Sequence, residues 1–341
     1  MIKTRYWLIL PLIAAILAGC TTFSASSQSQ DAGRLVIYSG RSESLVAPII
    51  EQFSQASGVK VEVRYGNTSE LAATLLEEGK NSPADVFYAQ DPGGLGAVAN
   101  AGLLAELPDS TLEKVESRFR SATGLWVGIS GRARVVVYNT QRLQPANLPA
   151  DLFGFTDPRW KGKIGWAPTN ASFQAMVTAM RQMWGEEKTR QWLEGILANQ
   201  PVVYDGNTAV VAAVGSGEVE VGFVNHYYLY RFLREQGESF PARNHFMNNG
   251  GPDSLVMVSG IGRLAAGKNE ENALKFINFL LSPVAQQYFA GQTFEYPLVA
   301  GVQTEAGLTS LESLNAANIS VDQLADLEGT LNLLRETGVL P

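Results

Sequence analysis

The feature that most constrains the fold is a regular alternation of strand-like and helix-like segments near the start of the chain. Residues 34–38 (RLVIY) are apolar in the manner of a buried strand, and residues 45–53 repeat apolar side chains at helical spacing. Residues 59–65 alternate apolar and polar side chains, residues 70–78 form a second helix pattern, and residues 84–88 form a third strand pattern. Strands joined by helices through short turns predict a parallel sheet that is covered on both faces.

A second set of strand and helix patterns, between residues 135 and 254, predicts a second α/β lobe. Two extended stretches, residues 123–140 and 255–261, interrupt the alternation and are candidates for crossovers between the lobes. Residues 321–337 have apolar side chains at helical spacing, which predicts an amphipathic helix near the C-terminus. We therefore predict an α/β protein with two lobes.

The N-terminus has the pattern of an export signal. Lys3 and Arg5 precede an apolar run over residues 6–18, which is too short for a stable transmembrane helix. The run ends in the letters LAGC, and a cysteine at this place resembles the lipobox of bacterial lipoproteins. We predict a signal peptide over residues 1–19 and a mature chain that begins with lipidated Cys20. The alternative is an ordinary signal peptide followed by an incidental cysteine.

The segment after this signal is polar. Residues 20–33 are rich in serine and glutamine, which predicts a flexible tether between a membrane anchor at Cys20 and the folded body. The protein is therefore expected at the cell envelope, anchored to the membrane and facing the periplasm or the exterior.

Composition argues against several classes of function. The chain has 26 basic and 33 acidic residues, and loss of Lys3 and Arg5 with the signal leaves 24 against 33, a formal charge of −9. No basic tract occurs, so we expect no nucleic-acid partner. Cys20 is the only cysteine, so no intrachain disulfide is expected. Neither histidine lies in a hydrolase motif and the P-loop pattern is absent, which argues against an enzyme.

Two adjacent tyrosines mark the candidate site. In the stretch VEVGFVNHYYLYRF, alternating apolar residues predict a strand that ends at Asn225-His226, directly before Tyr227 and Tyr228. The backbone turns at a strand-to-helix junction, so both phenol oxygens can converge at the edge where open α/β sheets bind ligands. Two phenolates make a hard, anionic oxygen site that suits Fe(III) better than zinc or copper. The alternative is a pair of core or rim aromatics with one hydroxyl hydrogen-bonded.

Six motifs carry a family resemblance. They are YSGRSES at 38–44, SPADVFYAQ at 82–90, SGRARVVVYNT at 130–140, RWKGKIGWAPTNASF at 159–173, VNHYY at 224–228 and EYPL at 295–298. In order and spacing they closely resemble the periplasmic ferric-iron-binding proteins of ABC transporters, and the match covers nearly all of the mature chain. This resemblance implies extended hinge strands, closure around Fe(III), and Tyr227 and Tyr228 as iron ligands.

The same resemblance implies a type II periplasmic-binding-protein fold, in which each lobe is a mixed sheet flanked by helices and the ligand cleft lies between the lobes. We expect an N-terminal lobe formed by residues 34–133 with 259–307. We expect a C-terminal lobe formed by residues 134–258 with 308–341.

The chain departs from this family at the other iron ligands. Ser42 stands where some members have a histidine, and Gln90, a candidate metal ligand, stands where some have a glutamate. Residues 170–173 (NASF) lack the tyrosine that other members have there. His226 precedes the tyrosine pair and His245 lies in a loop, so neither histidine is a simple replacement. Candidates for a third phenolate, all at strand ends, are Tyr65, Tyr88 and Tyr204.

Charge balance predicts a small anion as a co-ligand. Two phenolates leave one positive charge of Fe(III) uncompensated, and the metal must itself drive their deprotonation. Carbonate or bicarbonate is the first choice, with citrate or phosphate next. Arg41 lies in the turn before the first helix, where free N–H groups and the helix dipole favour an anion that its guanidinium can bind through two bonds. Other possible donors at such turns are Ser39, Ser42, Asn170, Ser172 and Asn207.

Each of these polar residues has a structural alternative. Arg41 is alternatively a solvated or salt-bridged loop arginine, and the serines and asparagines alternatively only cap helices. Arg132 and Arg134 flank the first crossover, where we expect salt bridges that stabilise the hinge; the alternative is that one of them reaches the cleft. Asn225 is expected to brace the tyrosine loop.

Together these inferences predict a lipid-anchored binding protein that captures Fe(III) between two lobes. We expect a monomer that delivers the metal to the permease and ATPase of an ABC transporter. The alternative is a protein of the same fold that binds a metal-free anion or a small organic solute. The sequence leaves open whether the cargo is bare Fe(III) or a chelate, and which residues complete the coordination.

Overall fold

The structure, a computed structural model, describes residues 33–304 and 308–341. These residues form one compact unit. The predicted signal peptide at residues 1–19, the lipidated Cys20 and nearly all of the tether at 20–33 lie outside the described residues and stay predictions.

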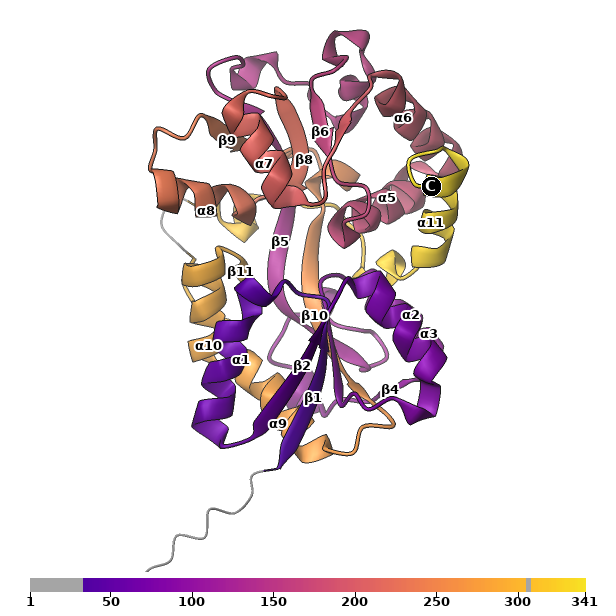
Figure 1. Cartoon of the computed structure of the whole chain (residues 1–341), viewed down its shortest axis with the longest axis vertical. Helices are drawn as coiled ribbons and strands as arrows, with labels where there is room; N and C mark the ends of the chain where they lie inside the picture. The colour runs from indigo at the N-terminus through magenta and orange to yellow at the C-terminus, as the bar shows by residue number, and fades with distance from the viewer. Residues whose placement is uncertain (1–32, 305–307) are drawn as a thin grey trace, which may run out of the picture. The chain divides into compact units, whose positions relative to one another are not determined.

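The described residues form strands and helices in alternation (Figure 1). The strands are β1 (Arg34–Ser39), β2 (Lys60–Tyr65), β3 (Val86–Ala89), β4 (Leu104–Ala105), β5 (Trp126–Asn139), β6 (Ile164–Trp166), β7 (Val202–Val203), β8 (Val221–Asn225), β9 (Ala242–His245), β10 (Val256–Leu264) and β11 (Tyr296–Pro297). The α-helices are α1 (Glu43–Ser57), α2 (Thr68–Glu78), α3 (Pro92–Asn100), α4 (Asp109–Leu112), α5 (Ala171–Trp184), α6 (Glu186–Ala198), α7 (Asn207–Ser216), α8 (Tyr227–Gln236), α9 (Glu270–Leu280), α10 (Pro283–Tyr288) and α11 (Leu327–Glu336).

The strands form two mixed sheets that share β5. In the first sheet, β1 pairs in parallel with β2 and β3, and β10 pairs antiparallel with β3 and β5. In the second sheet, β5 pairs antiparallel with β8 and β9, while β6 pairs in parallel with β7 and β8. Helices α1 and α10 lie on one side of the first sheet in Figure 1, and α2 and α3 lie on the other. The predicted α/β architecture with mixed sheets and flanking helices is thereby confirmed.

The two long strands β5 and β10 occupy the predicted crossover stretches. All 14 residues of β5 are buried, and it pairs with strands of both sheets. The pairing of β5 with β10 shifts register between Ser259 and Gly260, which marks a β-bulge. Gly128 on β5 has no room for a side chain, because a Cβ there would lie 2.5 Å from the backbone oxygen of Phe119. Because β5 and β10 pair with each other, segments that are distant in the sequence lie side by side in the fold.

One prediction about helices needs correction. The amphipathic helix predicted over 321–337 is instead a short 3₁₀ turn at Val321–Leu324 followed by α11, because the side chain of Asp326 caps a new helix start through the Gly329 N–H (3.0 Å).

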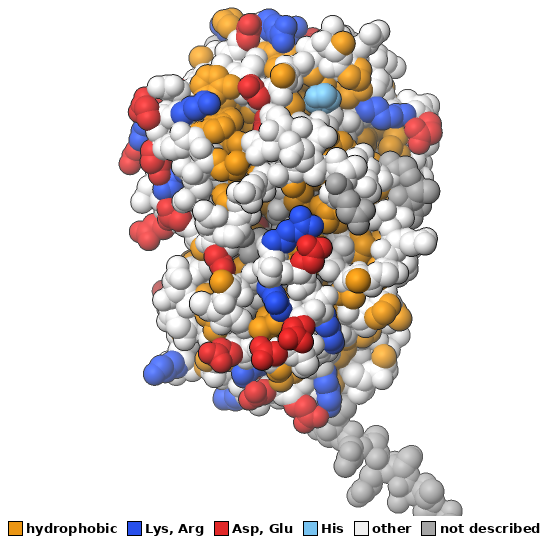
Figure 2. Space-filling model, turned by 180° about the vertical axis from the view of Figure 1, so that it is seen from behind, with side chains coloured by type: hydrophobic (Ala, Val, Ile, Leu, Met, Phe, Trp, Pro, Cys, Tyr) orange, Lys and Arg blue, Asp and Glu red, His pale blue; other side chains and the backbone are white. Residues whose placement is uncertain are grey.

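The buried side chains combine ordinary core residues with unusual charges. Trp126, Trp166 and Trp192 are among the largest fully buried side chains, and so are Arg41, Arg132 and Arg134. Arginine is rarely buried to this extent without a partner. On the face shown in Figure 2, by contrast, basic side chains are interspersed with acidic ones. Over the described residues, no helix has the length and apolar character needed to cross a membrane. The buried arginines therefore point to an internal polar site.

Candidate functional site

The tyrosine pair lies where strand β8 ends and helix α8 begins. Asn225 is the last residue of β8, His226 has helical backbone angles, and Tyr227 is the first residue of α8. The rings of Tyr227 and Tyr228 stack with centroids 4.2 Å apart and planes inclined by 28°. Both side chains are buried, and the Tyr227 hydroxyl has no hydrogen-bond partner among the described residues. The two phenols are thus neighbours in one enclosed region and not members of separate apolar clusters.

Charged side chains surround this pair. Burial, followed by the neighbouring Tyr227, raises the pKa of Tyr228 well above its ordinary value, while the charges of Arg41 and Arg132 oppose that shift. Burial, followed by the charge of Arg132, lowers the pKa of Arg134 to about 9. The two phenols favour the charged form of Arg134. Loss of protons from the tyrosines would therefore favour the charged form of Arg134, although burial and the neighbouring phenol oppose that loss at Tyr228.

Arg41 is held by a buried carboxylate. Its Nη2 donates to Oε1 of Glu295, and both side chains are fully buried. Although burial disfavours its charged form, Glu295, then Tyr227 and then Tyr88 raise the pKa of Arg41. Nε and Nη1 of Arg41 have no partner within the described part of the chain. Arg41 is thus salt-bridged, as the alternative interpretation held, and it keeps two donor nitrogens for a ligand.

Ser172, in the first turn of α5, collects hydrogen bonds from three directions. Its Oγ lies 3.1 Å from Gln90 Nε2, 3.1 Å from Arg132 Nη1 and 3.0 Å from Asn225 Nδ2. A hydroxyl offers two acceptor lone pairs, so three donors exceed its capacity. Donors therefore outnumber acceptors at this point, which is the condition for binding an anion.

Arg132 and Arg134 do not form the salt bridges expected of them. Arg132 donates to Ser172, and Arg134 Nη1 donates to Asn225 Oδ1 at 3.1 Å. No ion pair involves either arginine among residues 33–304 and 308–341, and Nε and Nη2 of both lack a hydrogen-bond partner there. The reason is that the acceptors within hydrogen-bonding reach of these two guanidiniums are neutral side chains. Asn225, which was expected to brace the tyrosine loop, donates to Ser172 and accepts from Arg134.

The other residues proposed for anion binding lie in different surroundings. Asn170 Oδ1 accepts from the Ser172 N–H at 3.0 Å, which caps α5, and Asn207 Nδ2 lies 3.4 Å from the same oxygen. Asn207 is buried, and its Oδ1 has no partner in the described chain. Ser39 is buried, with its Oγ bonded to backbone groups within its own turn. Ser42 is exposed and makes no capping bond, so its side chain lies apart from the others.

Of the three candidates for an additional phenolate, Tyr88 is the one beside the charged cluster. It is fully buried near the end of β3, and its hydroxyl has no hydrogen-bond partner among the described residues. Burial raises the pKa of Tyr88 to about 12, and the charge of Arg41 opposes this shift. The hydroxyl of Tyr204 donates to Glu218 at 2.9 Å, and Tyr65 is half-buried at the end of β2.

Neither histidine is placed to bind a metal. The Nδ1 of His226 accepts from the Ala133 N–H at 3.1 Å, so Nε2 carries the proton and donates to the Phe294 carbonyl at 2.8 Å. Burial lowers the pKa of His226 to about 4, and the ring stays neutral near pH 7. His245, which was expected in a loop, is instead a half-buried residue of β9, where it pairs with Val136 of β5. Within the described residues, no group of three or more His, Cys, Asp or Glu side chains could hold a metal ion.

Two buried carboxylates were missed as site residues. Glu295 entered the sequence argument only as part of the EYPL motif. Asp91 follows Gln90; its Oδ1 accepts from the Gly93 N–H at 3.1 Å, and Oδ2 has no partner in the described chain. Burial raises the pKa of Asp91, and the charge of Arg132 opposes this. A signal was available for Glu295, since a glutamate between apolar residues in an otherwise buried motif requires a charged partner.

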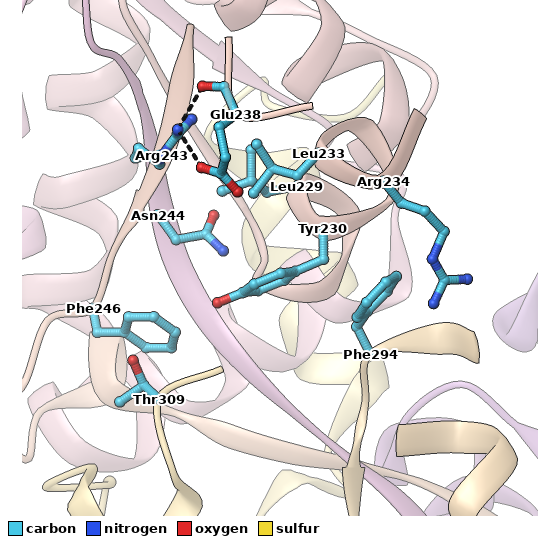
Figure 3. A pocket seen from close by; sticks show the side chains of 10 residues that line it. All are labelled: Leu229, Tyr230, Leu233, Arg234, Glu238, Arg243, Asn244, Phe246, Phe294 and Thr309. Atoms are coloured by element: carbon cyan, nitrogen blue, oxygen red, sulfur yellow. Dashed lines mark hydrogen bonds and ion pairs between the residues drawn. The ribbon is translucent and has the colours of Figure 1, made fainter. Parts of the chain in front are cut away.

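A separate pocket of about 640 Å³ lies beside helix α8 (Figure 3). It is lined by Tyr230, Arg234, Phe294 and neighbouring side chains, and neither residue of the tyrosine pair is among them. In Figure 3 the rings of Tyr230 and Phe294 face each other, with centroids 5.5 Å apart. This pocket and the tyrosine pair are therefore distinct features of the same helix.

Comparisons with known proteins identify the family. A family model of the bacterial extracellular solute-binding protein matches residues 48–316, which is most of the chain. The chain belongs to this family. Members of the extracellular solute-binding family are binding proteins and not enzymes, which agrees with the sequence prediction.

Three known proteins illustrate the similarity. An Fe(3+)-binding periplasmic protein of Serratia marcescens is 35% identical over 320 residues, 93% of this chain and 94% of the relative. The crystal structure of iron-bound HitA from Pseudomonas aeruginosa is 34% identical, with a TM-score of 0.86 over 89% of this chain and 99% of that one. A Trichodesmium protein in complex with iron and citrate is 31% identical, with a TM-score of 0.75 over 90% of this chain and 99% of that one.

Proposed function

We propose that this protein binds Fe(III) outside the cytoplasm and delivers it to the permease and ATPase of an ABC transporter. The observation that carries the proposal is the stacked, buried pair of Tyr227 and Tyr228 beside unpaired guanidiniums. Two phenolates provide the hard oxygen ligands that Fe(III) prefers. The relatives named above support the same cargo, because one is an Fe(3+)-binding periplasmic protein and another is iron-bound in its crystal structure.

The cargo is bound together with an anion, for which carbonate is the first choice. The buried charged groups at the site are three guanidiniums and two carboxylates, which leaves one positive charge. Two phenolates and Fe(III) add one more positive charge, so two remain. With two phenolates, a doubly charged anion makes the site neutral, which a buried site requires. A third phenolate would leave one positive charge, which a singly charged anion such as bicarbonate would neutralise. Citrate and phosphate are the alternatives.

The anion would be held by donors that now have no acceptor. The free nitrogens of Arg41, Arg132 and Arg134 supply charged N–H groups, and charge-assisted bonds of this kind are strong. Ser172 and Asn207 supply neutral donors from the starts of α5 and α7. Asn170 contributes as the cap that positions Ser172. Ser39 and Ser42 contribute less, because the first is bonded within its turn and the second is exposed.

The remaining coordination positions are filled by the anion and by groups near the pair. Tyr88 is the phenol best placed to become a third ligand, and Gln90 is a further candidate ligand through its amide oxygen. Loading occurs by closure of an N-terminal lobe (34–133 with 259–307) on a C-terminal lobe (134–258 with 308–341). Closure is a hinge motion in which the ligand selects the state that contacts both lobes. The mature protein is a monomer anchored through lipidated Cys20.

A second candidate function is the capture of an anion without metal. It is favoured by the six guanidinium nitrogens of Arg41, Arg132 and Arg134 that lack partners in the described chain. Such a set of donors would bind phosphate or a carboxylate even if the phenols stayed protonated.

Colour distinguishes these functions. Purified protein mixed with Fe(III) and bicarbonate should turn orange to red through phenolate-to-iron charge transfer. Tyr227→Phe with Tyr228→Phe should abolish the colour, whereas Tyr230→Phe on the same helix should keep it. Colour that persists in the double variant would refute the site. A colourless wild type that binds phosphate would favour the second function.

The anion is tested separately. Arg41→Ala should weaken iron retention in the presence of bicarbonate, and strict omission of bicarbonate should weaken it in the wild type. Equal iron affinity with and without bicarbonate would show that carbonate is not the co-ligand.

A further inference from the structure

Glu295 is a buried carboxylate that joins three parts of the fold. Its Oε1 accepts from Arg41 in the turn before α1, and its Oε2 accepts from Ser130 Oγ on β5. Ser130 Oγ in turn bonds Ser259 Oγ on β10 at 2.7 Å, at the register shift of the two crossover strands. Among ion pairs of the described residues, Arg41–Glu295 is the one in which neither side chain has any exposure. A charge so enclosed acts on its neighbours with little solvent screening.

The backbone that carries Glu295 is also tied to the tyrosine loop. A π-helix over Phe289–Thr293 ends at Phe294, which has left-handed angles of φ 58° and ψ 27°. This conformation is uncommon for a bulky residue, and strained backbone of this kind concentrates at functional sites. The Phe294 carbonyl accepts from His226, the residue before Tyr227. Glu295 is therefore positioned by contacts on both sides of the candidate site.

The charge of Glu295 has a specific consequence for ligand choice. Without Glu295, Asp91 would be the one buried carboxylate described near the three buried guanidiniums. Arg41, Arg132 and Arg134 would then bind a free anion tightly in the absence of metal. A site of higher positive potential would also repel Fe(III) more strongly.

We propose that Glu295 is a positioning residue that determines specificity. It orients Arg41 and cancels one guanidinium charge, so the site binds a free anion weakly and binds the anion together with Fe(III). The effect of Glu295 on iron retention rests on the proposed function, whereas its effect on anion binding concerns the metal-free protein alone.

The test compares Glu295→Gln with wild type by calorimetric titration of metal-free protein with inorganic phosphate. The variant should bind phosphate about tenfold more tightly, because one negative charge near the anion is removed. Glu295→Asp keeps the charge and should remain within about threefold of wild type. Glu220→Gln removes a carboxylate from the distant Lys163 pair and should change nothing. Unchanged phosphate affinity in Glu295→Gln, or an equal gain in Glu295→Asp, would overturn the proposal.

If Glu295→Gln alone does not fold, the same substitution is tested in a protein that also carries Arg134→Gln. Arg134→Gln with Glu295→Gln has the wild-type charge at the site, so no additional buried charge is left uncompensated. It should bind phosphate about tenfold more tightly than Arg134→Gln alone, and equal affinities would overturn the proposal.

Iron retention provides the second readout. Glu295→Gln should lose Fe(III) to a citrate competitor about tenfold faster than wild type, while Glu295→Asp should not. If wild-type protein forms no coloured iron complex, the proposed function fails, yet the phosphate titrations still decide the role of Glu295 in anion selection.

Discussion

Gln90 Nε2 donates to Ser172 Oγ at 3.1 Å. Gln90 directly follows β3 of the first sheet, and Ser172 lies in the first turn of α5, which contacts β8 of the second sheet. The contact therefore links groups carried by both sheets beside the tyrosine pair. The tyrosine site is therefore enclosed by a hydrogen bond between two neutral side chains, one from each sheet.

We expect Gln90→Ala to favour opening of the metal-free protein. Loss of one neutral hydrogen bond costs about 1 kcal/mol, which corresponds to roughly a fivefold change in the ratio of closed to open forms. Release of Fe(III) to a chelator should accelerate by a similar factor. Gln191→Ala, which removes an exposed glutamine bonded to Glu187, serves as the control and should leave release unchanged. Equal release rates in wild type and Gln90→Ala would contradict the bridging role.

Tyr88→Phe tests the third phenolate. We expect the iron complex of this variant to remain coloured, because Tyr227 and Tyr228 are intact. Its absorption maximum should shift, and iron retention should fall about tenfold or more, since one charged oxygen ligand is lost. Tyr204→Phe is the control, because the Tyr204 hydroxyl is bonded to Glu218. A Tyr88→Phe spectrum identical to that of wild type would exclude Tyr88 from the coordination.

His226 should make the fold sensitive to acid. Its pKa is lowered to about 4 in the folded state by burial, below the ordinary value of about 6.5. The folded protein thus binds fewer protons, so this contribution to stability is complete above pH 6.5 and is lost as pH falls through 4. The loss amounts to about 3 kcal/mol. Urea unfolding of metal-free protein at pH 7 and pH 4.5 should show it.

The matched variant for this measurement is His226→Gln, whose amide can bond to both Ala133 and Phe294. We expect a flatter dependence of its unfolding free energy on pH over the same window. If both proteins lose the same free energy between pH 7 and pH 4.5, acid sensitivity arises from other groups.

Arg134 illustrates a conflict between stability and binding. Its pKa is lowered to about 9 by burial and by Arg132, so keeping it charged in the folded protein costs free energy. We expect Arg134→Gln to stabilise the metal-free protein by about 2 kcal/mol in chemical unfolding. The same variant should bind phosphate more weakly than wild type. Arg190→Gln on the surface should change neither quantity. Destabilisation by Arg134→Gln would show that the charge is already compensated.

Much of the fold could be predicted from short-range patterns. The alternation at residues 59–65 and the helical spacing at 45–53 report burial on one face of an element, and they led to β2 and α1 within a few residues. The junction before Tyr227 was predicted for the same reason. The pattern failed at residues 321–337, where the amphipathic spacing runs through a break that the Asp326 cap creates.

The site was less predictable, because its residues meet only through the crossovers. Arg41 and Glu295 are 254 positions apart in the chain, and no periodic pattern relates them. Arg132 and Arg134 were expected in salt bridges because arginines near a hinge often form them. Their actual partners, Ser172 and Asn225, lie 40 and 91 positions away, respectively.

The sequence by itself determined the kind of elements, their order and the presence of two adjacent phenols at a strand end, because these properties depend on neighbours within a few residues. Tertiary structure alone decided which charges surround those phenols. Three guanidiniums and Glu295 come together only when β5 and β10 pair, and their unscreened interactions exist only once water has been excluded from between them.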